Sequence, residues 1–288
     1  MTARTDRVVL IAVSLATLAA AGCATARNYD HPLGPVIEHR VEVAPLERTR
    51  AVTPDLRVVT FNVKFAEHVE EAAALLAGNA LTSHADVLVL QEMDAPGADR
   101  VARALLMNHV YVPSAVHPSS DRDFGVAILS PWPISGVRKV VLPHQHRFRK
   151  LRRAAVAATI HGPLGEFRVY GLHLENPWGL SPGNRRDQAR AALADAVDWP
   201  GPIVMAGDLN GRAPAEEIEK AGFSWLTRDV HNTIGPLDAD HVLARGFCDA
   251  GTVPAGKIDG ARGVSDHVPV WSALRYCEPS TPGPQRSR

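Results

Sequence analysis

Short apolar runs that end in polar residues recur along most of the chain. Such runs, rich in valine and other strand-forming residues, predict β-strands. The pattern occurs at 56–63, 85–91, 124–130, 154–160, 166–174, 202–207, 240–244 and 267–274. After 202–207 come Asp208 and Asn210, whose side chains would share one face of an extended chain. The pair is compatible with a binding site at the end of a strand, and also with a plain turn, because Gly, Asp and Asn favour turns.

Three further segments have the spacing of helices, with apolar residues three or four positions apart. These positions are Val69, Ala73, Leu76 and Ala80 in the first segment, Val101, Leu105 and Met107 in the second, and Ala189, Leu193 and Val197 in the third. The second helix is expected to begin after the breaker pair Pro96-Gly97. Because strands and helices mix without strict alternation, the pattern favours a two-layer or sandwich α/β architecture over a simple doubly wound sheet.

The N-terminus has the pattern of a secretory signal rather than of a folded element. Arg4 and Arg7 precede the apolar run Val8–Ala21, which ends in small residues. Its fourteen residues fall short of the roughly 20 that a membrane-spanning helix needs. Cys23 follows Ala-Ala-Gly, which resembles the lipobox of bacterial lipoproteins; there the signal, here 1–22, is removed and the cysteine thiol is lipidated. An ordinary signal peptide with an incidental cysteine is the alternative.

The remaining chain divides into three parts by composition. Residues 23–53 are polar and contain several prolines, so we expect an irregular tether; 54–277 forms one domain without internal repeats; and 278–288 is a disordered tail. Cys248 and Cys277 could form a disulfide in an oxidising compartment or remain free thiols. We expect an exported monomer anchored through Cys23. Since Ala24 rather than Asp follows the cysteine, it would face the periplasm from the outer membrane if the source is Gram-negative.

The charge composition excludes attraction of polyanions by the overall electrostatic field of the protein. Its 31 basic and 31 acidic residues give 288 residues a formal net charge of zero, so any phosphate contact must use a local patch. One patch is the run 146–153, with five cationic side chains, which could face phosphate or be a solvated edge protected by charge. In the loop after 166–174, Pro177-Trp178 could line a substrate pocket, but packing is the first expectation, since Trp is usually mostly buried.

Polar residues with metal- and proton-binding side chains stand at the ends of most predicted strands. They are Asn62, Glu92, His173, Asp208, Asn210, Asp240, Asp266 and His267. Each alone could be a cap or turn residue. Together they indicate one site, because buried polar groups next to apolar strands need partners.

The motifs that contain these residues carry a resemblance. "TFNV", "LQEMD", "GVAILSPWPI", "GLHLEN", "GDLN", "DHVLARG" and "SDHVPV" occur in this order over about 60–270. In this the sequence resembles the endonuclease/exonuclease/phosphatase superfamily, which has the DNase I-like fold. The resemblance implies a four-layer α/β sandwich of two packed mixed β-sheets flanked by helices. It also implies Mg²⁺-dependent hydrolysis of phosphate esters, with Mn²⁺ as a substitute, and hard oxygen ligands without a thiolate suit those ions.

The resemblance also implies a metal and phosphate site. Glu92 matches the principal metal-binding carboxylate, with Asn62 beside it, and Asp266 matches a further metal or water ligand. Asn210 is expected to contact phosphate or its surroundings, and Arg153 stands where family members often have a phosphate-binding arginine.

Proton transfer is assigned in the same way. Asp208 matches the residue that activates or orients the attacking water. His267 matches a general base or phosphate-binding imidazole whose tautomer Asp240 would fix. His173 matches the histidine that protonates the leaving oxygen in nucleases and sphingomyelinases, and Asp123 is expected to orient it.

These expectations predict a membrane-anchored phosphodiesterase. A nuclease is the first candidate, with nucleic acid as substrate, although a neutral chain argues against tight DNA binding. A sphingomyelinase-like phospholipase C acting on phospholipid headgroups and a phosphomonoesterase are alternatives, because fold does not decide substrate. An inactive binding lipoprotein would be expected to lack Glu92, Asp208 or His267, and all three are present.

Overall fold

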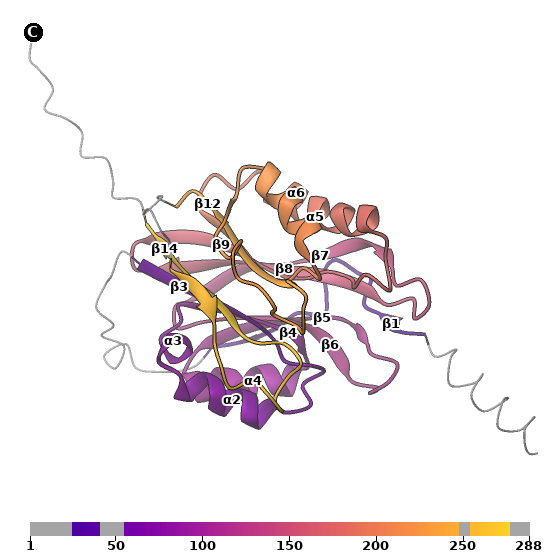
Figure 1. Ribbon diagram of the computed structural model, residues 1–288, viewed down its shortest axis with the longest axis horizontal. Helices are drawn as coiled ribbons and strands as arrows, with labels where there is room; N and C mark the ends of the chain where they lie inside the picture. Colours follow the sequence, from indigo (N-terminus) through magenta and orange to yellow (C-terminus); the bar gives the residue numbers. More distant parts are fainter. Residues whose placement is uncertain (1–24, 41–54, 248–253, 277–288) are drawn as a thin grey trace, which may run out of the picture.

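The computed structural model describes residues 25–40, 55–247 and 254–276. Two mixed β-sheets pack face to face, and helices cover the outer face of each, so the molecule has four layers (Figure 1). The predicted signal peptide, Cys23, Cys248, Cys277 and the predicted tail lie outside the described residues. Within the described ranges, no helix has the length and apolar character needed to cross a membrane.

The first sheet has eight strands, in the order β1-β5-β6-β4-β3-β14-β13, with β2 also beside β5. Their bounds are β1 (Arg27–Asn28), β2 (Ile37–His39), β3 (Asp55–Asn62), β4 (Val87–Met93), β5 (Asn108–Val116), β6 (Asp123–Ser130), β13 (Ala255–Lys257) and β14 (Val270–Arg275). The central strands β3 and β4 are parallel, so their carboxyl ends lie at the same edge. Three helices cover the outer face, namely α2 (Val69–Gly78), α3 (Ala80–Ser83) and α4 (Ala95–Leu105).

The second sheet has six strands, in the order β11-β12-β10-β9-β8-β7. Their bounds are β7 (Ile134–Gln145), β8 (Arg152–Gly162), β9 (Gly165–His173), β10 (Ile203–Asp208), β11 (Ser224–Trp225) and β12 (Asp240–Arg245). Strands β9 and β10 are parallel, and β12 runs antiparallel to β10. Helices α5 (Pro182–Ala196) and α6 (Arg212–Lys220) cover the outer face of this sheet.

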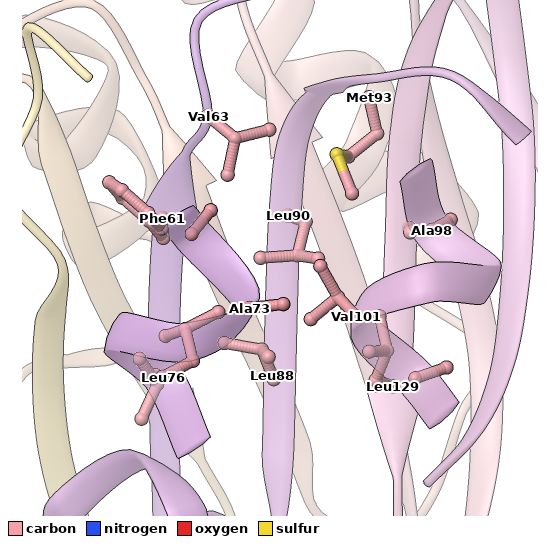
Figure 2. Close-up of a cluster of buried hydrophobic side chains, with 14 of the residues drawn as sticks. Phe61, Val63, Ala73, Leu76, Leu88, Leu90, Met93, Ala98, Val101 and Leu129 are labelled. Carbon is pink, nitrogen blue, oxygen red and sulfur yellow. The ribbon is translucent and has the colours of Figure 1, made fainter. Parts of the chain in front are cut away.

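The central strands are buried on both faces, which explains their unbroken apolar sequences. In β3, Val58 points into the layer between the two sheets, whereas Val59 and Phe61 point to the layer beneath the helices. Figure 2 shows this outer layer, where α2 and α4 place Leu76 and Val101 against the sheet. The fold therefore places the strand ends at one edge of two packed sheets.

The eight predicted strands are confirmed, but some elements escaped the pattern. Strands β5 and β7 were missed because Pro113 interrupts the first and bulges and polar residues interrupt the second. The predicted start of α4 is wrong: the breaker pair lies in its first turn, where Asp94 Oδ1 accepts a hydrogen bond from Gly97 N at 2.8 Å. Proline is tolerated there because the first helical N–H groups lack intrahelical partners. Val197 is exposed, since α5 ends at Ala196.

The expectation of an irregular tether is wrong for residues 25–40. Strands β1 and β2 both pair with the edge strand β5. The Tyr29 hydroxyl donates to Asp123 Oδ1 at 2.8 Å, and Lys139 Nζ donates to the Gly34 carbonyl at 3.1 Å. An edge strand offers unpaired N–H and C=O groups, so even a short segment can dock against it.

Candidate active site

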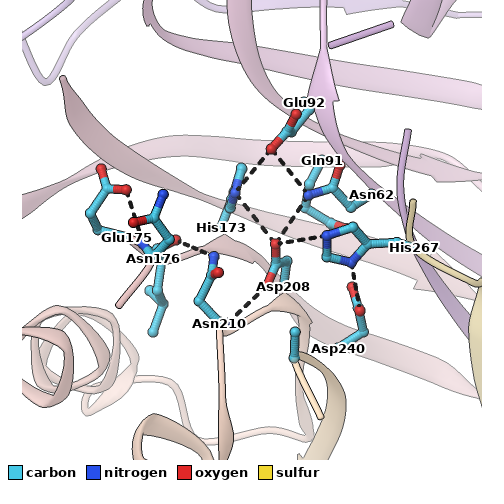
Figure 3. Close-up of polar contacts among 12 residues, drawn as sticks. Asn62, Gln91, Glu92, His173, Glu175, Asn176, Asp208, Asn210, Asp240 and His267 are labelled. Atoms are coloured by element: carbon cyan, nitrogen blue, oxygen red, sulfur yellow. Dashed lines mark hydrogen bonds and ion pairs between the residues drawn. The ribbon is translucent and has the colours of Figure 1, made fainter. Parts of the chain in front are cut away.

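Strand register brings three predicted site residues together on the second sheet. Asp208, the last residue of β10, stands opposite His173 on β9 and opposite Asp240 on β12. From the first sheet, Asn62 at the end of β3 and Glu92 near the end of β4 face them (Figure 3). His267 lies in the loop just before β14. The polar group thus gathers where the ends of both sheets meet.

A β-bulge aims Glu92 at this group. The pairing of β4 with β6 shifts register between Gln91 and Met93, and Glu92 has a φ of 58°, which is uncommon for a residue other than glycine. Its Oε2 accepts from Phe65 N at 3.1 Å, and its Oε1 accepts from Asn62 Nδ2 at 3.3 Å. Burial raises the pKa of the Glu92 carboxyl, although neighbouring Arg153 opposes this.

The segment Gly207–Asn210 is both a turn and part of the site. Gly207 is required at a φ of 152°, because a Cβ there would lie 1.9 Å from the Leu172 carbonyl oxygen. Asp208 Oδ1 accepts from Asn210 N at 2.8 Å, and Asp208 Oδ2 accepts from Asn62 Nδ2 at 3.0 Å. The Asn210 side chain donates to the Leu174 carbonyl at 2.9 Å, so its amide group fixes the neighbouring loop.

His267 forms a buried pair with Asp240. Its Nδ1 lies 2.8 Å from Asp240 Oδ2, and its Nε2 lies 3.8 Å from Asp208 Oδ2. Burial opposes a charged ring, but the carboxylates of Asp240 and Asp208 outweigh it and raise the pKa of His267 to about 10. Burial raises the pKa of Asp208 to about 7, despite the opposing charge of His267. This half of the site therefore favours a protonated imidazole between two carboxyl groups.

His173 has the opposite environment. Its Nδ1 lies 3.0 Å from Arg153 Nη1. Since a guanidinium can only donate, Nδ1 must accept, and the ring proton is on Nε2. That Nε2 lies 3.7 Å from Glu92 Oε1 and 3.5 Å from Asp208 Oδ2. Burial, Arg153 and His267 together hold the pKa of His173 well below its usual range.

Arg153 is itself held by a buried carboxylate that the sequence reasoning missed. Its Nε and Nη2 each donate to Glu175 at 3.2 Å, and its guanidinium lies 4.8 Å from the centre of the Phe124 ring. Glu175 is fully buried, and its N–H donates to Gln188 Oε1 on α5 at 2.9 Å. The signal was available, because Glu175 is part of the quoted motif "GLHLEN". With these donors engaged, Arg153 orients His173.

Three residues are not where the sequence reasoning placed them. Asp123 accepts from the Tyr29 hydroxyl, and no described contact joins it to His173; Arg153 takes the expected place beside that ring. Asp266 is exposed and accepts from Ser265 Oγ at 3.4 Å, so it lies outside the buried group. Trp178 is 78% exposed, so the prediction that it packs is wrong.

The buried residues fit a divalent metal ion. Ligand atoms of Asp208, Asp240 and His267 all lie within 4.8 Å of one another. Asp240 Oδ1 is buried and has no hydrogen-bond partner. Asp208 and Glu92 are carboxyls whose ionised forms burial disfavours, and a cation would offset that cost. Oxygen-rich donors suit a hard cation. Because His267 and Asp240 already form a hydrogen bond with each other, the side of Glu92, Asn62 and Asp208 is the better position for the ion.

A cleft opens beside these carboxylates. Its cavity has a volume of about 70 Å³ and includes Glu92 and Arg153. The remaining lining residues are mostly aromatic or basic: Phe65, His117, Phe124, His146, Arg149, Leu151, Glu175 and Asn176. A small anionic group could therefore enter from this side and reach the buried carboxylates.

Comparison with known proteins identifies relatives at the level of a family. The family model described as "Endonuclease/Exonuclease/phosphatase family" matches residues 59–267. The comparison with curated proteins returned no match. Among solved structures, an endonuclease/exonuclease/phosphatase from Beutenbergia cavernae is 26% identical, with a TM-score of 0.61, over 77% of this chain and 72% of that one.

More distant structures share the fold. A family protein from Leptotrichia buccalis is 15% identical, with a TM-score of 0.59, over 77% of this chain and all of that chain. TDP2 from D. rerio, in a complex with a single-strand DNA product, is 16% identical, with a TM-score of 0.59, over 77% of this chain and 99% of that chain. At these identities the likeness supports the architecture of two packed sheets.

Proposed function

The chain belongs to the endonuclease/exonuclease/phosphatase family of phosphoric ester hydrolases, and from this premise we propose that it is a Mg²⁺-dependent phosphodiesterase, exported and anchored to a membrane through Cys23. One observation carries the proposal. Glu92, Asp208 and His267 come from distant segments and meet through Asn62 and direct contacts in one buried group. An inactive binding protein would have no need to keep this costly assembly of buried charges.

We assign the metal to Glu92, with Asn62 beside it, and leave Asp208 on the other side of Asn62 free to act on water. Asn62 Nδ2 contacts both carboxylates, which shows that the two lie close enough to share one partner. When bound, Mg²⁺ or Mn²⁺ supplies neutralisation of the phosphate charge and orientation of its oxygens. Asn62 is itself held by its Oδ1, which accepts from Lys64 N at 3.0 Å.

Asp208 and His267 are proposed to handle the attacking water and the phosphoryl charge. The Asp208 carboxylate, which Asn62 Nδ2 and Asn210 N hold in place, can accept a proton from the attacking water. The protonated His267 ring can donate from Nε2 to an anionic phosphoryl oxygen, while Asp240 fixes its Nδ1–H. This favours the phosphate-binding role of His267 over that of a general base.

His173 is proposed to act as a neutral donor rather than as the acid of the reaction. Arg153 fixes its tautomer and disfavours its charged form, so Nε2–H can donate to a phosphate or leaving-group oxygen without becoming imidazolium. The leaving oxygen would then receive its proton from water or from Asp208.

Two substrate classes follow. Nucleic acid is the first candidate, and the D. rerio TDP2 structure with its single-strand DNA product gives a precedent on this fold. A phospholipid headgroup is the second, and a specific observation favours it: Trp178 and Phe148 are 78% and 67% exposed. They contact Asn176 and His146, which line the cleft.

Hydrolysis of bis-p-nitrophenyl phosphate tests the activity. We expect turnover with Mg²⁺ or Mn²⁺ and none with EDTA, and Glu92→Gln should remove it while leaving the fold intact. A panel of plasmid DNA, single-stranded DNA, RNA, sphingomyelin and inositol phosphates at matched metal then separates the substrate classes. If no substrate is turned over with metal, the chain is a binding protein.

The anchor needs its own experiment. Replacing Cys23 with Ser should release the protein from the membrane fraction. A wild-type protein that never enters that fraction, or a variant that stays there through an uncleaved signal, would contradict the lipoprotein assignment.

A further inference from the structure

The basic run 146–153 divides into a paired and an unpaired half. Arg152 Nε lies 2.9 Å from Asp30 Oδ1, and Arg153 is paired with buried Glu175. The other three cations are exposed, and no acidic side chain of the described residues pairs with them: Arg147, Arg149 and Lys150. These three form the turn between β7 and β8, so this hairpin carries unneutralised positive charge at its tip.

A second loop joins this tip and adds exposed aromatic side chains. Arg147 N donates to the Gly179 carbonyl at 3.1 Å, so the loop that carries Trp178 lies against the hairpin. The Arg147 guanidinium lies 4.6 Å from the centre of the exposed Phe148 ring. We call residues 147–150 and 177–178 the basic-aromatic rim. It borders the catalytic cleft, because Arg149 lines the same cavity as Glu92.

The N-terminal segment is attached directly to this rim. Ala26 N donates to the Arg149 carbonyl, and Asn28 Nδ2 donates to the Lys150 carbonyl, both at 2.8 Å. Asn28 Oδ1 accepts from Arg152 N at the same distance. Cys23 precedes Ala26 by three residues, which span at most about 10 Å. A lipid on Cys23 would therefore hold the rim close to the bilayer.

We propose that the basic-aromatic rim rests on the phospholipid headgroup layer and that the catalytic cleft opens toward the membrane surface. This rests on the proposed anchor at Cys23. Exposed aromatic rings favour the interface between bilayer and water, and Lys and Arg are drawn to anionic headgroups. A flexible tether over 23–53 would have left the domain free to turn, whereas the docked residues 26–28 fix which face meets the membrane. The substrate phosphodiester is then one presented at that surface.

Single-stranded nucleic acid is the competing partner for such a surface, since it also binds aromatic rings and cations. The hydrogen bond between Ala26 and Arg149 favours the membrane surface over single-stranded nucleic acid. A strand lying over the rim would need the space that an anchored bilayer, about 10 Å from Ala26, already takes.

Vesicle binding of the purified protein tests the surface independently of the anchor. Phosphatidylcholine vesicles with and without phosphatidylglycerol are sedimented with wild type, Phe148→Ala/Trp178→Ala and Arg147→Glu/Lys150→Glu. Matched controls are Leu164→Ala, an exposed apolar residue beyond the far end of β8, and Lys220→Glu on α6. We expect salt-sensitive binding to anionic vesicles, weakened at least about tenfold by the charge reversals and several-fold by the aromatic variant, with both controls unchanged.

A second readout locates the contact. In lipidated protein reconstituted in vesicles, brominated lipid should quench a tryptophan emission component that Trp178→Phe removes. Anchored protein without that component, equal binding of rim and control variants, or rim-dependent binding of single-stranded DNA without vesicle binding would each overturn the proposal. Hydrolysis of bis-p-nitrophenyl phosphate is measured in parallel. A protein that binds vesicles through the rim but turns over nothing refutes the proposed activity, and the surface assignment stands.

Discussion

The two halves of the site each hold a buried histidine, and they treat it in opposite ways. His267 has a carboxylate at Nδ1, which is Asp240 at 2.8 Å, whereas His173 has the guanidinium of Arg153 at 3.0 Å. Both rings are almost completely buried, so desolvation alone would make both neutral. The charged neighbours decide the difference: Asp240 and Asp208 raise the pKa of His267 to about 10, whereas burial, reinforced by Arg153, holds the pKa of His173 well below its usual range.

The two residues are of the same type, but their different charge states suit them to different functions. His267 can offer a positive charge to a phosphate, while His173 can offer a neutral N–H. Their Nε2 atoms approach the same Asp208 Oδ2, at 3.8 Å and 3.5 Å. The site thus surrounds one carboxylate oxygen with a charged donor and an uncharged one.

Replacing each of the two histidines with Gln should reveal the largest difference between them. Gln retains a neutral donor but cannot carry charge. We expect His267→Gln to lower kcat by about 10²–10³-fold, because the charged donor to the phosphoryl oxygen is lost. His173→Gln should keep turnover within about tenfold, the scale of one adjusted hydrogen bond. Steady-state kinetics with a soluble diester measure both, and equal losses at the two positions would show that the charge of His267 plays no special part.

Removing the guanidinium of Arg153 should lower the free energy of unfolding more than the rate of turnover. Arg153→Met leaves Glu175 buried without its cation, which should cost about 3–5 kcal/mol of unfolding free energy. The double variant Arg153→Met/Glu175→Met should recover most of that loss, since no buried charge then lacks a partner. Denaturant unfolding of the two variants checks this, and a double variant no more stable than the single one would refute the assigned pairing.

In a folded Arg153 variant, His173 should also become easier to protonate. Arg153→Gln keeps a donor but no charge, so the pKa of His173 should rise toward its ordinary value. NMR titration of the ring protons in metal-free protein would report it, with His267 as the internal control.

The pH dependence of stability, measured in EDTA, should also differ between the two histidines, by a smaller amount. His267 keeps its proton in the folded state up to about pH 10, whereas an unfolded histidine loses it near about pH 6.5. Its contribution is therefore fully present below about pH 6.5 and is lost as pH rises through about 10. His173 is neutral when folded and becomes protonated when unfolded below about pH 6.5, so it lowers stability as pH falls. Unfolding curves across this range should lose their alkaline slope in His267→Gln and part of their acidic slope in His173→Gln.

Much of the fold and most site positions could be predicted from the chain because the signal is local. Continuous apolar runs such as Val87–Leu90 are required wherever a strand is covered on both faces. Polar residues directly after such runs had to lie at the strand ends. Strand β5 and the docked segment at 25–40 escaped prediction, because their pairing depends on an edge strand that no local pattern reveals.

The sequence by itself determined most strands, the strand ends and the residue types that meet there, since burial and alternation are written in neighbouring positions; the four layers came from the family resemblance. Tertiary structure alone decided the environment of each of these residues. The charge states of His267 and His173 depend on Asp240 and Arg153, which stand 27 and 20 positions away in the chain. The proposed orientation of the cleft toward a membrane depends on the hydrogen bond between Ala26 and Arg149. Electrostatic environment and docking act through space, so only the folded chain sets them.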